Sequence, residues 1–243
     1  TGANPQIFMR GVGTRITGTG LDSAVAVYVD DRFVTRQTGQ VFDIYDVERV
    51  EVLKGPQGVL FGRNSTGGAI RIITAEVSDE LEGEVSFGYG SDSFQMARGF
   101  INVPVTDNFG LRVSAQTRQR DAFKENIISN AEDFDDLDAE SIRVKARWDV
   151  SDRSTLKFSY DRSKATDLSS SGAVSLDRGN PRGVALGGIT TSERDKIASS
   201  MGTDPFYGSP KIKSDSFQLR FETSLFDSLD LAAYVHYADF RSA

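Results

Sequence analysis

The chain has 243 residues, of which 38% are hydrophobic, and a formal net charge of −7. A negative net charge disfavours nucleic acid as a partner, because nucleic-acid binding depends on lysine and arginine to neutralise phosphates. Cysteine is absent, which excludes disulfides and thiolate metal sites. No apolar run approaches the roughly 20 residues of a membrane helix, so a helical membrane protein is excluded.

The first informative segment is DVERVEVLKGPQGVLFGRNSTGGAIRIIT, at residues 46–74, which joins two strand-like runs through a glycine-rich turn. Its glycines predict positive φ angles or close approach of neighbouring backbones, as a compact connector needs. They are Gly55, Gly58, Gly62, Gly67 and Gly68. A phosphate-binding loop is the competing interpretation. It is disfavoured because the Walker pattern ends in Gly-Lys-Ser/Thr, whereas Lys54 precedes the glycines.

A series of short motifs across the first third of the chain carries a family resemblance. The motifs include an Arg-Gly step, an apolar strand ending in Asp, and the glycine-rich segment above. They lie at residues 10–11, 27–30, 50–58, 60–64, 67–70 and 72–74. In this order they resemble the end of the plug domain of TonB-dependent outer-membrane receptors. Asp31 departs from the family, which usually has glycine there, and we expect a strained left-handed turn because Asp tolerates that backbone.

Beyond about residue 82 the sequence changes to long segments in which apolar and polar residues alternate. The segments are residues 84–89, 111–116, 142–149, 156–160, 217–221 and 229–237, with a poorer alternation at 94–103. Period-two alternation predicts strands, and lengths of about 10 residues suit a tilted membrane crossing.

The connections between these segments alternate in length after a first brief link. The short joins are residues 103–109, 149–154 and 225–229, and the long ones are 121–138 and 163–213. Such alternation predicts short turns on the periplasmic side of a barrel and long loops outside. The two long loops are candidates for outer ligand contacts or a lid.

These observations predict a mostly β fold. We expect an α/β plug domain at residues 1–76, followed at residues 82–243 by about seven strands that begin a transmembrane antiparallel β-barrel. Seven strands cannot enclose a plug, since plugged barrels have about 22, so we expect the chain to be a fragment. Any targeting segment is expected to lie outside it, because Thr1 follows no Met or leader.

The resemblance implies energy-coupled import across the outer membrane of a Gram-negative bacterium. The implied ligand is a small molecule, a ferric siderophore or other iron chelate, and the implied partners are outer-membrane lipid and the inner-membrane TonB complex, which pulls on the plug. Rival interpretations are uptake of cobalamin, haem or oligosaccharide by the same mechanism, and a passive porin, which the plug disfavours. A soluble all-β binding module is disfavoured by the strand lengths and the loop alternation.

The resemblance also places the upward-facing plug loops at residues 11–23 and 34–40 and at the turn around residues 61–63. Cations and an amide there suit an anionic chelate, and an aromatic ring would stack on it. The candidate ligand contacts are Arg15, Arg36, Gln37, Phe61 and Arg63. Pairing of the three arginines with barrel carboxylates is the alternative.

A second candidate group lies on the first strand of the glycine-rich segment. In the family such charges bridge plug and barrel wall, so Glu48, Arg49, Glu51 and Lys54 are predicted to form a latch that yields when the plug is pulled. The cations available on the lumen faces of the later strands include Arg112, Arg143, Lys145 and Lys157.

Catalytic and metal sites receive little support. The acidic run at residues 132–138 could bind calcium, but it lacks the glycine and spacing of an EF-hand loop, so a solvated loop is the preferred interpretation. His236 is the only histidine, which supports neither a histidine-rich metal or haem site nor a Ser-His-Asp triad. We predict no enzymatic activity, no cofactor and no metal.

Overall fold

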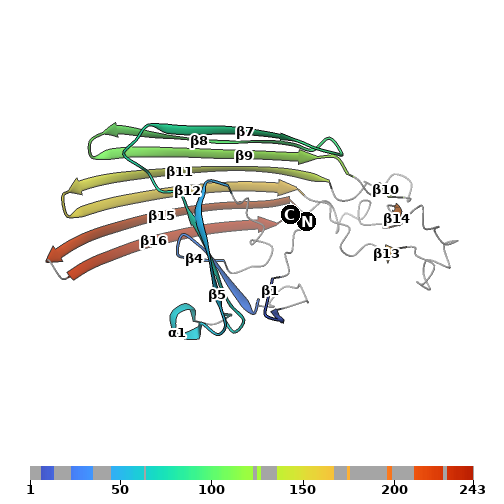
Figure 1. Cartoon of the computed structure of the whole chain (residues 1–243), viewed down its shortest axis with the longest axis horizontal. Helices are drawn as coiled ribbons and strands as arrows, with labels where there is room; N and C mark the ends of the chain where they lie inside the picture. Colours follow the sequence, from blue (N-terminus) through green and yellow to red (C-terminus); the bar gives the residue numbers. More distant parts are fainter. Residues whose placement is uncertain are drawn as a thin grey trace.

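The computed structural model describes residues 7–13, 23–34, 45–62, 64–122, 125–126, 136–166, 174–175, 196–198, 211–226 and 229–242. Two sheets define the architecture of this part of the chain, a four-stranded sheet near the N-terminus and a seven-stranded sheet after it (Figure 1). No helix among the described residues is long and apolar enough to cross a membrane.

The four-stranded sheet has the order β4-β3-β6-β5, in which β3 is parallel to β6 and the other pairs are antiparallel. Its strands are β3 (Val25–Val29), β4 (Arg32–Phe33), β5 (Val47–Lys54) and β6 (Gly68–Thr74). The hairpin β1 (Phe8–Met9) and β2 (Val12–Gly13) and the short helix α1 (Gly58–Phe61) accompany it. Together the described residues from 7 to 74 form what we call the plug unit.

Branched aliphatic side chains hold the plug unit together. Val27, Val29, Val34 and Ile72 form its buried core, and Ile70 packs against them. Because β3 and β6 alternate with period two, their inward residues come together on one face of the sheet. This small core orients the turns at both ends of the sheet.

Most glycines of the glycine-rich segment have the positive φ angles or the close backbone approach that the sequence predicts. Gly68 has φ +142°, and a Cβ there would collide with the Leu53 carbonyl oxygen and the Met9 sulfur. A Cβ on Gly67 would lie 3.2 Å from the Ala24 carbonyl oxygen, so this position needs close approach. The prediction is wrong at Gly58, whose φ is not positive and whose surroundings are open.

The seven-stranded sheet, called the wall below, has the order β16-β15-β12-β11-β9-β8-β7, so each strand pairs antiparallel with its neighbours in the order. Its strands are β7 (Glu82–Tyr89), β8 (Gln95–Thr106), β9 (Phe109–Arg120), β11 (Leu137–Ser151), β12 (Ser154–Thr166), β15 (Lys211–Phe226) and β16 (Leu229–Ser242). The predicted fold class, a plug followed by antiparallel strands of an incomplete barrel, is confirmed.

The structure differs from the sequence prediction at two connections. Pro104, expected in a turn, lies inside β8 next to a register shift between Pro104 and Thr106, where a strand tolerates proline. The long connections, predicted as loops, contribute β10 (Glu125–Asn126), β13 (Val174–Ser175) and β14 (Lys196–Ala198) to a three-stranded sheet.

The two faces of the wall have opposite chemistry. Polar residues on one face are buried, among them Asn102, Arg112, Gln116, Arg143 and Lys145. The other face exposes large apolar residues, including Phe87, Tyr89, Ile101, Trp148, Phe217, Leu219, Val235 and Tyr237. A sheet in a soluble protein buries its apolar face, so this reversed pattern is that of a barrel strand with lipid outside and a polar interior.

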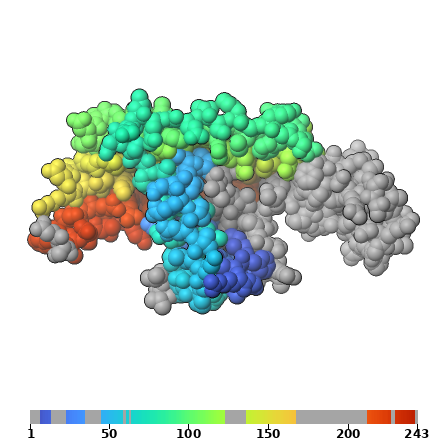
Figure 2. All heavy atoms as spheres, in the orientation of Figure 1, coloured from blue at the N-terminus to red at the C-terminus, as the bar shows by residue number. Residues whose placement is uncertain are grey.

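The plug unit projects from the polar face of the wall (Figures 1 and 2). Its helix α1 lies at the end of the plug unit farthest from the wall (Figure 1). Residues 75–81, called the linker, connect β6 to β7. The contacts that join the plug unit to the wall therefore lie at the opposite end of the plug unit from α1.

Candidate functional site

Acidic turns of the plug unit meet the wall. Asp30, Asp31 and Asp46 have positive φ angles of 46°, 67° and 49°. Such a backbone costs a residue other than glycine about 1–3 kcal/mol and persists only where the surroundings stabilise it. The predicted left-handed turn at Asp31 is confirmed, and the carboxylates of all three residues contact wall cations.

The most buried of these contacts joins Asp46 to Arg112 on β9. The Arg112 Nη2 lies 2.5 Å from Oδ1 of Asp46 and the Nε 3.0 Å from Oδ2, and the two side chains are 6% and 4% exposed. Arg112 also pairs with Glu82 at 3.1 Å, and its guanidinium lies 3.9 Å from the centre of the Phe100 ring. Removing one partner of such a buried pair typically costs about 3–5 kcal/mol.

A second wall arginine holds the residue before Asp46. Arg143 on β11 donates to the Tyr45 carbonyl oxygen at 3.3 Å, and its guanidinium lies 5.0 Å from the centre of the Tyr45 ring. Arg143 also binds the carboxylate of Asp161 on β12. Burial raises the pKa of Tyr45, so its hydroxyl is neutral at physiological pH.

Lys145, the next inward residue on β11, joins the wall to the end of the plug sheet at which the parallel strands β3 and β6 both end. Its Nζ lies 2.9 Å from Glu76, 3.5 Å from Asp30 and 3.4 Å from the Thr74 carbonyl oxygen. Asp30 in turn accepts hydrogen bonds from the backbone N–H of Thr74 at 2.8 Å and from its hydroxyl at 2.5 Å. The β3–β4 turn and the end of β6 therefore form one unit with the wall.

The linker is fixed by a buried asparagine. Asn102 on β8 is fully buried and donates to the carbonyl oxygens of Ser78 at 2.9 Å and Glu80 at 2.7 Å, while its Oδ1 accepts from the Ser78 N–H at 3.1 Å. Arg147 on β11 adds a hydrogen bond to the Val77 carbonyl oxygen and an ion pair with Asp79 at 2.9 Å. These contacts give hydrogen-bond partners to backbone groups of the linker that are not paired within a β-sheet.

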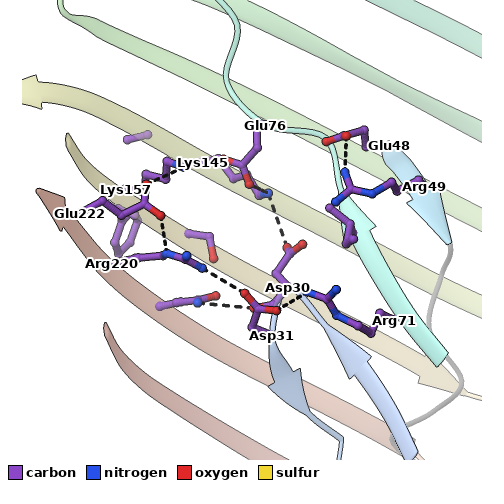
Figure 3. Close-up of a pocket in the computed structure, with 15 residues that line it drawn as sticks. Asp30, Asp31, Glu48, Arg49, Arg71, Glu76, Lys145, Lys157, Arg220 and Glu222 are labelled. Atoms are coloured by element: carbon purple, nitrogen blue, oxygen red, sulfur yellow. Dashed lines mark hydrogen bonds and ion pairs between the residues drawn. The ribbon is translucent and has the colours of Figure 1, made fainter. Parts of the chain in front are cut away.

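A cavity of about 250 Å³ lies between the plug sheet and β11, β12 and β15 (Figure 3). Seven of its charged side chains, together with the neighbouring Glu51, form a chain of ion pairs in which the sign alternates. In order they are Lys157, Glu222, Arg220, Asp31, Arg71, Glu51, Arg49 and Glu48. The chain crosses from wall to plug at one step, the 3.0 Å contact between Arg220 and Asp31.

Three of the four predicted latch residues lie at the plug end of this chain of ion pairs. Glu48, Arg49 and Glu51 pair with one another and, through Glu51, with Arg71 at 2.7 Å. Lys54 ends β5 opposite Gly68, at the other end of the strand. Their function as a latch stays a prediction.

Four of the predicted ligand contacts, Arg15, Arg36, Gln37 and Arg63, lie outside the described residues. Phe61 is described, and its ring centre lies 5.1 Å from that of Tyr28. Burial raises the pKa of Tyr28, whose neutral hydroxyl donates to the Phe61 carbonyl oxygen at 2.9 Å. Phe61 therefore has a packing role within the plug unit, whether or not it contacts a ligand.

Sequence reasoning missed three carboxylates that contact the wall, Asp30 and Asp46 of the plug unit and Glu76 of the linker. It also missed Asn102, which holds the linker. The available signals were weak. Asp30 ends an apolar strand and Asp46 precedes one, both common turn positions, and Asn102 is a polar residue at an inward strand position.

Three comparisons with known proteins agree with this architecture. Residues 1–69 match the family model described as the TonB-dependent Receptor Plug Domain. The pesticin receptor of Yersinia pestis is 32% identical over 114 residues, which are 47% of this chain and 16% of that protein. The iron-regulated outer membrane virulence protein of Vibrio cholerae is 36% identical over 81 residues, 31% of this chain and 12% of that protein.

Two solved structures share the fold over most of the chain. The ferric yersiniabactin uptake receptor FyuA from Yersinia pestis matches with a TM-score of 0.70 at 22% identity. The match covers 91% of this chain and 33% of the FyuA chain. The closed form of the ferric-catecholate import receptor Fiu from E. coli K12 has a TM-score of 0.66 at 16% identity, covering 89% of this chain and 29% of its own.

The fold and the interface define a plug joined to the polar face of a sheet that has the pattern of a barrel wall. The predicted resemblance is confirmed: residues 1–69 match the plug-domain model of the TonB-dependent receptors, and the strands that follow share the fold of solved receptors. It spans 16% and 12% of the length of the curated relatives named above.

Proposed function

We propose that the chain is part of an energy-coupled receptor in the outer membrane of a Gram-negative bacterium that imports a ferric siderophore or another iron complex. The observation that carries the proposal is the junction itself. A plug is held by charged pairs on the polar face of a wall whose other face is apolar and therefore suited to lipid.

The proposed division of the chain is a plug domain at residues 1–76 and a barrel portion at residues 82–243. Import requires the plug to move. Ion pairs favour one plug position without a large net gain in stability, because desolvation offsets much of their attraction. A pull by the TonB complex of the inner membrane is the proposed energy input.

The proposed ligand class follows from the names of the similar proteins. These include a ferric yersiniabactin uptake receptor, a ferric-catecholate import receptor and an iron-regulated outer membrane protein. Arg15, Arg36, Gln37, Phe61 and Arg63 remain the proposed ligand contacts. The similar proteins are named as receptors and transporters, so we propose binding and transport rather than catalysis.

Cobalamin is a second candidate ligand. A vitamin B12 transporter of Vibrio vulnificus is 18% identical over 196 residues, 80% of this chain. A vitamin B12 transporter of Photobacterium profundum is also 31% identical, over 77 residues. The first candidate is preferred because the relative of 36% identity is named for iron regulation and the solved structures that share the fold over most of the chain are named for ferric complexes.

The test is uptake by cells that express the full-length receptor gene in place of their own iron-complex receptors. Radiolabelled ferric siderophore should accumulate, and accumulation should stop when the proton gradient is discharged. Accumulation of labelled cobalamin instead would select the second candidate. Uptake that is unchanged after the gradient is discharged would identify a passive porin and contradict the proposal.

A further inference from the structure

Arg32 begins β4, directly after the Asp30–Asp31 turn, and faces a small cavity between the plug unit and the wall. The cavity volume is about 40 Å³. The polar residues around it include Arg32 of the plug unit and, on the wall, Arg143, Asp161, Ser163, Ser214 and Ser216. A space of this size holds one small ion or one or two water molecules.

Arg32 has no ion-pair partner in the described part of the chain, although other charged residues at this interface are paired. Burial lowers the pKa of Arg32, and the charge of Arg143 adds to this effect, while Asp161 and Asp30 oppose it. Arginine nevertheless stays protonated in proteins. Among the described residues, the interface therefore contains a partly buried positive charge that feels Asp161 and Asp30 at a distance but forms no ion pair of its own.

The two nearest carboxylates are already used. Asp161 binds Arg143. Asp30 accepts hydrogen bonds from Thr74 and pairs with Lys145. Among the described residues that line the cavity, Arg32, Arg143 and Arg162 are positive and Asp161 is the one carboxylate, so the local charge is positive. Arg162 also lies 3.9 Å from Asp215.

The remaining polar groups suit an anion. Ser163 and Ser214 stand opposite each other on β12 and β15, and the hydroxyls of Ser163, Ser214 and Ser216 can each donate a hydrogen bond. Val29 and Ile72 close part of the cavity with apolar surface, which limits access by bulk water. A neutral water molecule would satisfy hydrogen bonds but would leave the buried charge uncompensated.

We infer that the cavity between Arg32 and Arg143 is a binding site for one small monovalent anion of the halide class, which joins the plug unit to β11, β12 and β15. The anion would accept hydrogen bonds from Arg32 of the plug unit on one side and from Arg143 and the serine hydroxyls of the wall on the other. The site does not depend on which ligand the receptor carries or on whether it is energy-coupled.

The first experiment is crystallography of the full-length receptor grown in sodium bromide, with data collected at the bromine absorption edge. We expect an anomalous peak between Arg32 and Arg143 in the wild type. The peak should be absent in Arg32→Gln and present in Arg153→Gln, a matched control on the exposed turn between β11 and β12.

A second measurement keeps the inference testable if Arg32→Gln disturbs the plug. Thermal unfolding of the full-length receptor is compared in sodium chloride and sodium gluconate at equal ionic strength. Chloride should raise the unfolding temperature of the wild type, of Arg153→Gln and, by a smaller amount, of Arg32→Lys, because a ligand that binds only the native state stabilises it.

Three results would overturn the inference. The first is a peak that persists in Arg32→Gln, which would mean an adventitious ion only. The second is electron density for water alone, with no anomalous signal. The third is a carboxylate from another part of the full-length receptor occupying the cavity and pairing with Arg32.

Discussion

The guanidinium of Arg112 binds the carboxylate of Asp46 through two of its nitrogens, although the residues lie 66 positions apart in the chain. Both side chains are almost fully buried at the junction of plug and wall. Because both side chains are shielded from water, removing one would leave the other charge buried with fewer partners, so the plug should be sensitive to a single substitution in this pair.

Replacing Arg112 by alanine should therefore destabilise the seated plug by about 3–5 kcal/mol. The measurement is sensitivity of cells to a large antibiotic that an intact plug excludes, together with thermal unfolding of the purified full-length receptor. Arg241→Ala serves as the control, since that arginine is 77% exposed and pairs with Asp239 on its own strand. Equal behaviour of the two variants would contradict the importance of the buried pair.

The second prediction concerns the linker clamp. Asn102→Ala would leave the Ser78 N–H and the Ser78 and Glu80 carbonyl oxygens without their partner, at a cost of about 1–3 kcal/mol for each group that stays buried. Amide hydrogen exchange of residues 75–81 should become faster.

Thr106→Ala is the control for the clamp, because this threonine is exposed on the same strand. Unchanged exchange across the linker in Asn102→Ala would show that Arg147 and chain connectivity fix the segment without the asparagine.

Much of the fold could be predicted because a single local property specifies it. On β9, apolar residues (Leu111, Val113 and Ala115) alternate with polar ones (Arg112 and Ser114). This alternation alone predicts which side chains face the plug and which face away, without knowledge of the neighbouring strands. The glycines of residues 55–68 likewise predict the tight turn between β5 and β6 from the local sequence alone. Pro104 was misassigned because an irregular strand can accommodate proline, and a single sequence does not show the register.

The interface could be predicted only in part. Lumen-facing cations such as Arg112 and Arg143 follow from alternation, but their partners depend on how the plug is oriented. The sequence favoured Glu48 and Glu51 because they lie on a recognisable strand. The plug residues that pair with wall cations are instead Asp30, Asp31 and Asp46, in turns whose direction depends on tertiary packing.

The third prediction is a pH dependence at Asp31. Burial would raise the pKa of this carboxyl, but hydrogen bonds and charges from Arg71 and Arg220 outweigh it and lower the pKa below its ordinary value of 3.8. A carboxyl with a lowered pKa stabilises the folded state above its ordinary value, and this contribution is lost as the pH falls through the lowered pKa.

Asp31→Asn should therefore reduce the stability of the full-length receptor by about 0–1 kcal/mol at neutral pH, since the pair is partly exposed. The difference from wild type should shrink as the pH falls below 3.8. Thermal unfolding at several pH values measures it, and a difference of constant size down to the most acidic condition would contradict the assignment.

The fourth prediction tests the latch. Glu51→Lys reverses the charge that links Arg49 and Arg71, so the ion-pair chain should break between β5 and β6. We expect altered ligand uptake, weaker exclusion of large antibiotics, or both. Asp152→Lys makes the same charge change on an exposed turn of the wall and serves as the control. If uptake and exclusion are both unchanged in Glu51→Lys, the latch hypothesis is wrong.

The last prediction separates two roles of Phe61. Its ring packs on Tyr28, an aromatic contact worth about 0.5–1.5 kcal/mol beyond burial, so Phe61→Ala should destabilise the plug even without ligand. Phe61→Leu retains most of the apolar volume but removes the flat ring that would stack on a chelate. If Phe61 contacts ligand, Phe61→Leu should weaken binding of the labelled iron complex to whole cells while thermal unfolding changes little. Normal binding by Phe61→Leu, with reduced stability in Phe61→Ala, would assign the residue to packing alone and remove it from the ligand site.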